Sequence, residues 1–184
     1  MKKVAYVLKH LPRYAFRAML ALSSSAFVGV VYFINQGILL PFFPRQYPHL
    51  SYVIYCGLPL LLAFLCVLIS RKLPSSSIDC DLVAVEQADN SFLPSYLGYF
   101  FVALSISKIT TFTYIFLIIY VFTFVSHALY FNPMFLLMGY HFYNVQAEDG
   151  NKVFLITKQE MKNYKEISFQ NLRRINDYTY IDMG

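Results

Sequence analysis

The sequence is poor in charged residues. Only 14% of its 184 residues are Asp, Glu, Lys or Arg, whereas hydrophobic residues make up 58%. An ordinary globular domain carries about 25% charged residues. One larger core cannot explain this deficit, because a chain of this length must still cover a water-facing surface with polar groups. The composition therefore indicates an integral membrane protein and argues against a soluble enzyme.

Residues for metal, disulfide and catalytic centres are also scarce or unsuitably spaced. The three cysteines, Cys56, Cys66 and Cys80, form no CxxC or Cys/His pattern, so no zinc site or disulfide framework is predicted. No Gly-rich phosphate loop, HExxH pair or Ser/His/Asp set is found. The acidic stretch around Asp79 and Asp81 does not fit a calcium-binding loop. We therefore expect no catalytic residue, no metal and no cofactor, and we predict that the protein is not an enzyme.

Long apolar runs occupy most of residues 18–139. Two apolar runs, residues 18–40 and 50–70, are followed by a longer one, residues 92–131, which contains one charge, Lys108. As a single helix it would be about 60 Å long, twice the roughly 30 Å hydrocarbon core, so it is divided in two. We expect four transmembrane helices, at residues 18–40, 50–70, 93–109 and 112–132. The predicted fold class is an all-α bundle of four transmembrane helices, with a basic N-terminus at 1–17 and a cytosolic loop at 71–92.

The positive residues set the predicted orientation. If the N-terminus lies in the cytosol, all of the 15 Lys and Arg residues except Arg45 and Lys108 lie there too. Cytosolic segments of membrane proteins carry such an excess of positive charge. We therefore expect a multi-pass protein with both termini in the cytosol.

Residues 140–184 have a different pattern. Two apolar runs, 141–145 and 152–156, flank Asp149-Gly150, which is typical of a β-hairpin. An isolated hairpin is marginally stable, so we expect a third strand near the C-terminus or a partner surface. The sequence thus predicts a small cytosolic C-terminal module that contains a hairpin.

Charged residues outside the apolar runs are the candidates for contacts with partners or lipid. The candidates are Arg71, Lys72, Asp79, Asp81, Lys162, Lys165, Arg173 and Arg174. The basic ones fit three interpretations: topology determinants, contacts to anionic lipid headgroups, or a docking face for a protein or nucleic acid. The acidic pair suits partner recognition. Because the basic residues lie where membrane topology requires them, we do not expect direct nucleic-acid binding.

Several stretches together resemble a known family. They are Asn132-Pro133, Gly139-Tyr140-His141-Phe142-Tyr143-Asn144-Val145, Asp149-Gly150 and Val153-Phe154-Leu155-Ile156-Thr157. With the predicted plan of spans and hairpin module, they resemble the KwaA family, the membrane subunits of the Kiwa anti-phage defence system. The resemblance implies a bacterial inner-membrane protein that senses phage infection and forms a homo-oligomer, with a tetramer as one candidate. It also implies a cytosolic DNA-binding partner subunit, KwaB, that acts on phage DNA.

Three functions stay open at this point. The first is a non-enzymatic membrane sensor or scaffold that oligomerises and recruits a cytosolic DNA-binding effector. The second is a small oligomeric channel or transporter, supported by Ser and Thr in the spans and by Gly29 and Gly37, which allow close helix approach. All ten acidic residues lie outside the predicted spans, which weakens it, because ion-coupled carriers usually need ionisable groups inside the bilayer. The third is an enzyme acting at lipid headgroups, for which only the acidic stretch offers ligands.

Overall fold

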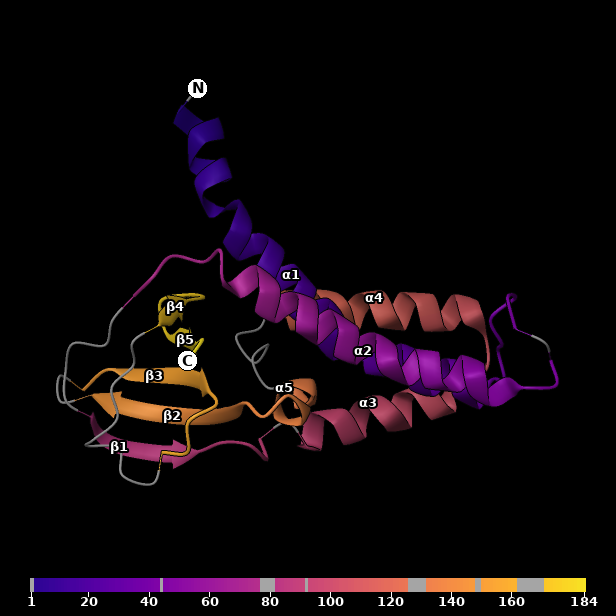
Figure 1. Ribbon diagram of the computed structural model, residues 1–184. Helices are drawn as coiled ribbons and strands as arrows, with labels where there is room; N and C mark the ends of the chain where they lie inside the picture. The colour runs from indigo at the N-terminus through magenta and orange to yellow at the C-terminus, as the bar shows by residue number, and fades with distance from the viewer. Residues whose placement is uncertain are drawn as a thin grey trace. The chain divides into compact units, whose positions relative to one another are not determined.

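The computed structural model describes residues 2–43, 45–76, 82–91, 93–125, 132–147, 150–161 and 171–184. The helices are α1 (Lys2–Asn35), α2 (Pro48–Ser70), α3 (Leu93–Ser105), α4 (Ile109–Val125) and α5 (Pro133–Leu137) (Figure 1). The strands are β1 (Leu82–Gln87), β2 (His141–Ala147), β3 (Lys152–Thr157), β4 (Leu172–Arg174) and β5 (Thr179–Asp182).

The chain divides into two compact units, each built from separated stretches. The helical unit contains Ala18–Leu65 and Phe92–Asn132, and the sheet unit contains Met1–Arg17, Cys66–Ser91 and Pro133–Gly184. The first two helices therefore contribute residues to both units. The two units are described in turn.

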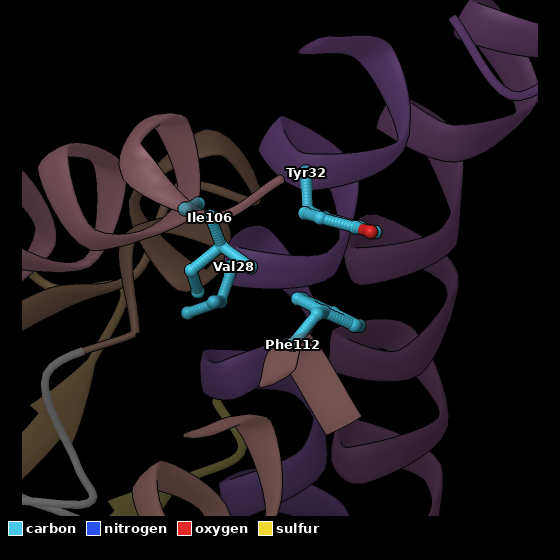
Figure 2. Close-up of a cluster of buried hydrophobic side chains, with 5 residues drawn as sticks. Val28, Tyr32, Ile106 and Phe112 are labelled. Carbon is cyan, nitrogen blue, oxygen red and sulfur yellow. The ribbon is translucent and has the colours of Figure 1, made fainter. Parts of the chain in front are cut away.

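The core of the helical unit lies where α1, the end of α3 and the start of α4 meet. The cluster comprises Val28, Tyr32, Ala103, Ile106 and Phe112 (Figure 2). The rings of Tyr32 and Phe112 are stacked, with centroids 4.1 Å apart and planes inclined by 10°. Offset stacking of this kind contributes about 0.5–1.5 kcal/mol beyond the burial of the rings. It fixes the rotation of α4 against α1.

Polar side chains also join the helices of this unit. The Ser23 hydroxyl donates to the carbonyl of Pro59 in α2 at 3.1 Å, and the Asn132 amide donates to the Ser23 oxygen at 2.8 Å. Ser23 and Asn132 are both fully buried. The side-chain amides of Asn35 and Gln36 donate hydrogen bonds to the carbonyls of residues 104 and 106, at and just after the end of α3. The last carbonyls of a helix have no N–H donor within the helix, so these amides supply one. These contacts hold helices together, so the Ser23 hydroxyl gives no support to a channel.

Large apolar side chains also cover much of the outer surface of the helical unit. Leu61 in α2 is 55% exposed, Phe101 in α3 is 69% exposed and Phe122 in α4 is 70% exposed. Large exposed apolar side chains thus occur on all three of these helices, and large apolar patches are rare on a water-facing monomer. This exposure indicates that this unit meets lipid or other apolar protein surfaces.

The predicted fold class, an all-α bundle of four transmembrane helices, is wrong. Two segments, Tyr14–Asn35 and Pro48–Ser70, are long and apolar enough to cross a membrane. Helices α3 and α4 have only 13 and 17 residues, below the roughly 20 that a span needs. The expected division of the run 92–131 into two helices assumed segments long enough to span, whereas α3 ends at Ser105 and the backbone leaves the helix at 106–108. A five-stranded sheet also replaces the expected lone hairpin and its single extra strand.

The sheet unit is built on a mixed sheet with strand order β1-β2-β3-β5-β4. Strands β2 and β3 form the predicted antiparallel hairpin, with Tyr143 opposite Leu155. The expected third strand is present as β5, which pairs in parallel with β3 and places Tyr180 opposite Leu155. Strand β1 lies in the stretch that was expected to be a loop, and it pairs antiparallel with β2. The hairpin thus gains partners on both sides.

Apolar side chains are buried on both faces of this sheet, because neighbouring residues of a strand point to opposite sides. One face carries the cluster Tyr143, Val145, Leu155, Met161 and Leu172. On the other face, the ring of Phe142 in β2 stacks on the ring of Phe154 in β3, with centroids 5.8 Å apart. It also lies 6.5 Å from the ring of Phe135 in α5. Both faces of the sheet are therefore packed with apolar side chains, and the polar contacts described below lie at the ends of strands.

Candidate functional site

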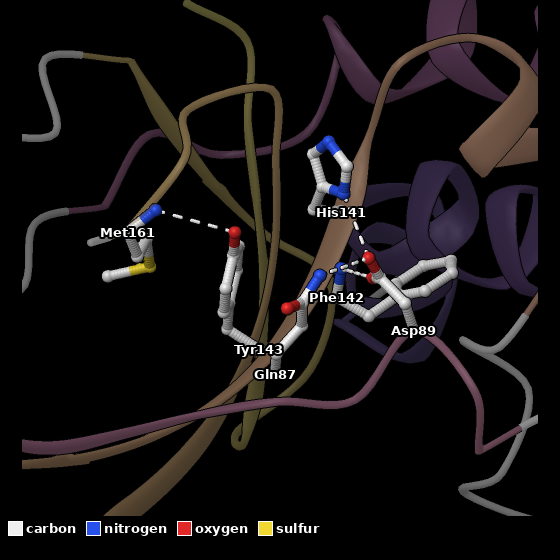
Figure 3. Close-up of polar contacts among 6 residues, drawn as sticks. All are labelled: Gln87, Asp89, His141, Phe142, Tyr143 and Met161. Carbon is white, nitrogen blue, oxygen red and sulfur yellow. Dashed lines mark hydrogen bonds and ion pairs between the residues drawn. The ribbon is translucent and has the colours of Figure 1, made fainter.

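A carboxylate ties the turn after β1 to the first residues of β2 (Figure 3). Asp89 Oδ1 accepts a hydrogen bond from the backbone N–H of Phe142 at 2.7 Å. Its Oδ2 accepts one from the Gln87 amide at 2.7 Å and lies 2.9 Å from Nδ1 of His141. The N–H of Ala88 donates to the carbonyl of Phe142 at 2.8 Å, which continues the ladder to the turn. One side chain thus fixes two segments that are 52 residues apart in sequence.

These contacts keep Asp89 ionised. Burial raises the pKa of this carboxyl, but the hydrogen bonds from His141, Phe142 and Gln87 outweigh burial and place the pKa below its ordinary value. The Asp89 side chain is 16% exposed and that of His141 is 34% exposed, so water reaches part of the pair. The Asp89–His141 pair is therefore a partly solvated, charge-assisted contact, called the Asp89–His141 clamp below.

A cavity of about 360 Å³ lies beside this clamp, at the lower end of the roughly 300–1,000 Å³ typical of small-molecule sites. It is lined by Val85, Gln87, His141, Tyr143, Glu160 and Met161. The Tyr143 hydroxyl closes one side by accepting the backbone N–H of Met161 at 3.4 Å. No Ser, Thr or Cys is among these lining residues, so the Asp89–His141 pair does not form a nucleophilic triad here. Within the described ranges, no group of three His, Cys, Asp or Glu could hold a metal ion.

The structure brings together four of the basic candidates from the sequence. Arg71 and Lys72 follow α2 directly and are exposed. Residues 73–76 then run along β4, which carries Arg173 and Arg174: the N–H of Arg174 donates to the carbonyl of residue 74 at 3.1 Å. The remaining candidates, Asp79, Asp81, Lys162 and Lys165, lie outside the described residues.

Two of these basic residues serve the fold. The Arg173 guanidinium donates to the carbonyl of Leu73 at 3.2 Å. The Arg174 guanidinium pairs with the carboxylate of Asp177 at 2.5 Å and also donates to the carbonyl of Asn176. Both side chains are only partly exposed, and both hold the C-terminal strands in place. Arg71 and Lys72 are therefore the better docking candidates of the four.

A second feature, absent from the sequence-based candidates, centres on Tyr140. Gly139 has φ +78°, and this left-handed turn lets the N–H of Tyr140 donate to the carbonyl of Phe135 at 2.9 Å. The Lys158 ammonium lies 4.8 Å from the centre of the Tyr140 ring. Burial raises the pKa of the Tyr140 phenol, the nearby charge of Arg71 lowers it, and Asp182 raises it, leaving the pKa above its ordinary value.

Sequence reasoning missed both features for the same reason. Asp89 was one acid of a polar stretch, and no pattern linked it to His141. Tyr140 and Lys158 stand on either side of the hairpin, and only the Gly139-Tyr140 junction gave a signal, as part of the family resemblance. Long-range sheet pairing, which local patterns do not encode, creates these contacts.

A family of known proteins matches the chain over most of its length. The matching family model is described as "Anti-phage protein KwaA" and covers residues 16–181. No curated protein and no solved structure matches the chain.

Proposed function

The chain belongs to the KwaA family of anti-phage proteins, and from that premise we propose that it is a non-enzymatic membrane sensor or scaffold. In this proposal it oligomerises in the bacterial inner membrane and recruits a cytosolic DNA-binding effector, KwaB. A role in anti-phage defence follows from the family. The sensing, oligomerisation and recruitment are the proposal.

One observation carries the membrane part of the proposal: the two units have opposite surfaces. The helical unit exposes large apolar side chains such as Leu61 and Phe122. The sheet unit carries the Asp89–His141 clamp, the exposed cations Arg71 and Lys72, and a polar-lined cavity. Contact with lipid removes the apolar side chains of the helical unit from water, whereas water solvates the polar and charged side chains of the sheet unit.

The same division supports recruitment from the cytosol. Positive residues gather in the sheet unit, including its N-terminal stretch, which favours the cytosolic side for that unit. In this proposal α1 and α2 both cross the membrane, and an even number of spans leaves both ends of the chain on the same side. The sheet unit then presents its strands and its cavity to soluble partners.

The membrane placement is tested by putting a charge on the exposed face of α2. Leu61 lies near the middle of this helix and is 55% exposed. An arginine at a bilayer centre costs about 2.5–3.5 kcal/mol, whereas on a water-facing surface it costs almost nothing. We therefore expect Leu61→Arg to reduce severalfold the protein recovered in carbonate-washed membranes. The matched control, Leu61→Met, should be recovered like the wild type.

Two outcomes contradict this placement. One is wild-type protein that carbonate releases into the supernatant. The other is Leu61→Arg protein recovered in membranes at the wild-type level, which would mean that this face of α2 meets water.

Recruitment is tested separately, by purifying the tagged full chain in mild detergent from cells that also express the partner subunit. We expect the effector to co-purify, and light scattering to give a membrane-subunit mass several times that of one chain. A monomeric mass with no co-purifying effector would refute the scaffold while leaving the membrane placement intact. A variant that no longer co-purifies the effector should lose phage protection in a plaque assay at an unchanged protein level, which would link the complex to defence.

A further inference from the structure

The cavity of about 360 Å³ in the sheet unit has an apolar floor and an exposed polar rim. The floor is made of buried or half-buried apolar side chains: Tyr143, Met161 and Val85. The rim is made of exposed or half-buried polar residues: Gln87, Glu160 and His141. A ligand in the cavity would therefore find its polar partners at the rim.

The three rim residues come from separate segments that the sheet brings together. Gln87 ends β1 and lies opposite Tyr143 in the β1–β2 ladder. His141 begins β2, and its ring centroid lies 6.4 Å from that of Tyr143. Glu160 lies after β3, next to Met161, whose backbone N–H donates to the Tyr143 hydroxyl at 3.4 Å. All three rim positions are thus fixed around the same tyrosine.

Asp89 decides which atoms two of these rim residues offer to a ligand. An ionised carboxylate only accepts hydrogen bonds, so each neighbour must turn a donor toward it. Gln87 donates through Nε2 at 2.7 Å, and its amide oxygen points away from Asp89 (Figure 3). His141 lies with Nδ1 at 2.9 Å from the carboxylate, so Nε2 of the neutral ring can only accept. The clamp therefore uses a donor of each side chain and leaves an acceptor on each.

The charge at the rim has the same preference as its hydrogen-bonding atoms. The carboxylate of Glu160 is an acceptor with a negative charge. Among the described residues that line the cavity, none is Lys or Arg. Lys158 precedes Glu160 by two residues, but its ammonium lies 4.8 Å from the centre of the Tyr140 ring, and Tyr140 does not line the cavity. The rim is therefore rich in acceptors and suits a cation that carries several donors.

We propose that this cavity binds a guanidinium group, carried by a small molecule or by an arginine side chain of a partner protein. A guanidinium presents several N–H donors in a flat fork, so one group can reach acceptors on Gln87, Glu160 and His141 together. An ammonium presents its donors from a single point. A guanidinium is also weakly hydrated, so its flat faces can lie against the apolar floor. The site does not depend on the membrane placement of the helical unit.

The experiment is isothermal titration of the full chain in mild detergent with matched small probes. We expect N-acetyl-arginine amide and agmatine to bind. N-acetyl-citrulline amide has the same shape but carries a neutral urea group, and it should show no measurable binding. Equal binding of the arginine and citrulline compounds would overturn the site. Equal binding of N-acetyl-lysine amide would overturn the guanidinium assignment, because any cation would then suffice.

Substitutions at the rim test the place of binding. Glu160→Gln should weaken binding about three- to fivefold, the loss expected for an exposed ion pair. Gln87→Lys keeps a donor for Asp89 but adds a positive charge to the rim, so it should abolish binding. The matched control is Glu86→Gln, which removes an exposed acid from the opposite face of β1 and should stay within about twofold of the wild type.

Two outcomes of this series would overturn the site. One is an equal loss in Glu86→Gln and Glu160→Gln, which would show attraction by diffuse surface charge. The other is unchanged affinity in both rim variants. Circular dichroism of each variant confirms that it is folded.

Two further comparisons separate the source of the guanidinium and the proposed function. Tighter binding of N-acetyl-arginine amide than of agmatine supports an arginine side chain of a partner, whereas the reverse order supports a free small molecule. Binding of these probes without co-purification of the effector would refute recruitment and keep this site. Co-purification of the effector without binding of either probe would overturn this site alone.

Discussion

Replacing Asp89 with alanine removes three hydrogen bonds from one carboxylate, donated by Gln87, by the His141 ring and by the backbone of Phe142. A hydrogen bond to a charged group contributes about 1.5–3 kcal/mol when it is buried. The pair is partly solvated, and exposed ion pairs contribute only about 0–1 kcal/mol. We therefore expect Asp89→Ala to lower the free energy of unfolding by about 2–3 kcal/mol.

The assay is thermal unfolding of the full chain in mild detergent, followed by circular dichroism. For a chain of this size, 1 kcal/mol shifts Tm by roughly 2–4 °C, so Asp89→Ala should lower Tm by about 4–12 °C. Asp89→Asn keeps an oxygen acceptor for the Phe142 N–H and should lose less. Asp177→Ala removes a carboxylate that is 77% exposed and pairs with Arg174, and it should change Tm by about 1 °C or less.

The pH dependence provides a second test of the same contacts. The pKa of Asp89 is lowered in the folded protein, so its contribution is fully present above the ordinary carboxyl value of about 3.9. It is lost as pH falls through the lowered value. The Tm difference between wild type and Asp89→Ala should therefore be constant from pH 8 to about pH 5 and shrink below about pH 4. The reasoning is refuted if Tm is equal at neutral pH, or if the difference persists unchanged in acid.

Three other substitutions test the fold. Phe112→Ala removes the buried ring stacked on Tyr32 and leaves a cavity, so it should cost about 3–5 kcal/mol by the shift in Tm. The exposed control Phe122→Ala leaves no cavity and should change Tm much less. Asn132→Ala removes the buried hydrogen bond to Ser23 and should cost about 0.6–1.7 kcal/mol, measured in the same way. Gly139→Ala forces a side chain into a backbone conformation with φ +78° and should cost about 1–2 kcal/mol; an unchanged Tm would contradict the strain.

The sequence predicted features whose signals are local. The apolar run 50–70 differs by two residues at one end from α2, Pro48–Ser70, because length and composition alone define such a helix. The Asp149-Gly150 dipeptide between two apolar runs correctly indicated the β2–β3 hairpin. Local periodicity and turn chemistry carried both predictions.

Features that depend on distant partners were not predicted. Strand β1 is a short, mostly apolar run of six residues inside a polar, acidic stretch, and it forms a strand by pairing with β2. The clamp at Asp89 exists only once that ladder forms, and a single sequence does not state which strands pair. Residues 92–131 hold two helices, as expected, but α3 ends at Ser105 and α4 begins at Ile109, not at the expected 109 and 112. Apolar composition alone does not indicate where such helices end.

The interleaving of the two units has a consequence for synthesis on the ribosome. Strand β1 ends at residue 87, and its partner β2 begins only at residue 141. At roughly 5–20 residues per second, β1 stays without its partner strand for several seconds while the second part of the helical unit, Phe92–Asn132, is translated. The apolar helices are therefore complete before the sheet can close. A nascent chain arrested before residue 141 would carry β1 without its partner strand, and unpaired strand edges are prone to aggregation.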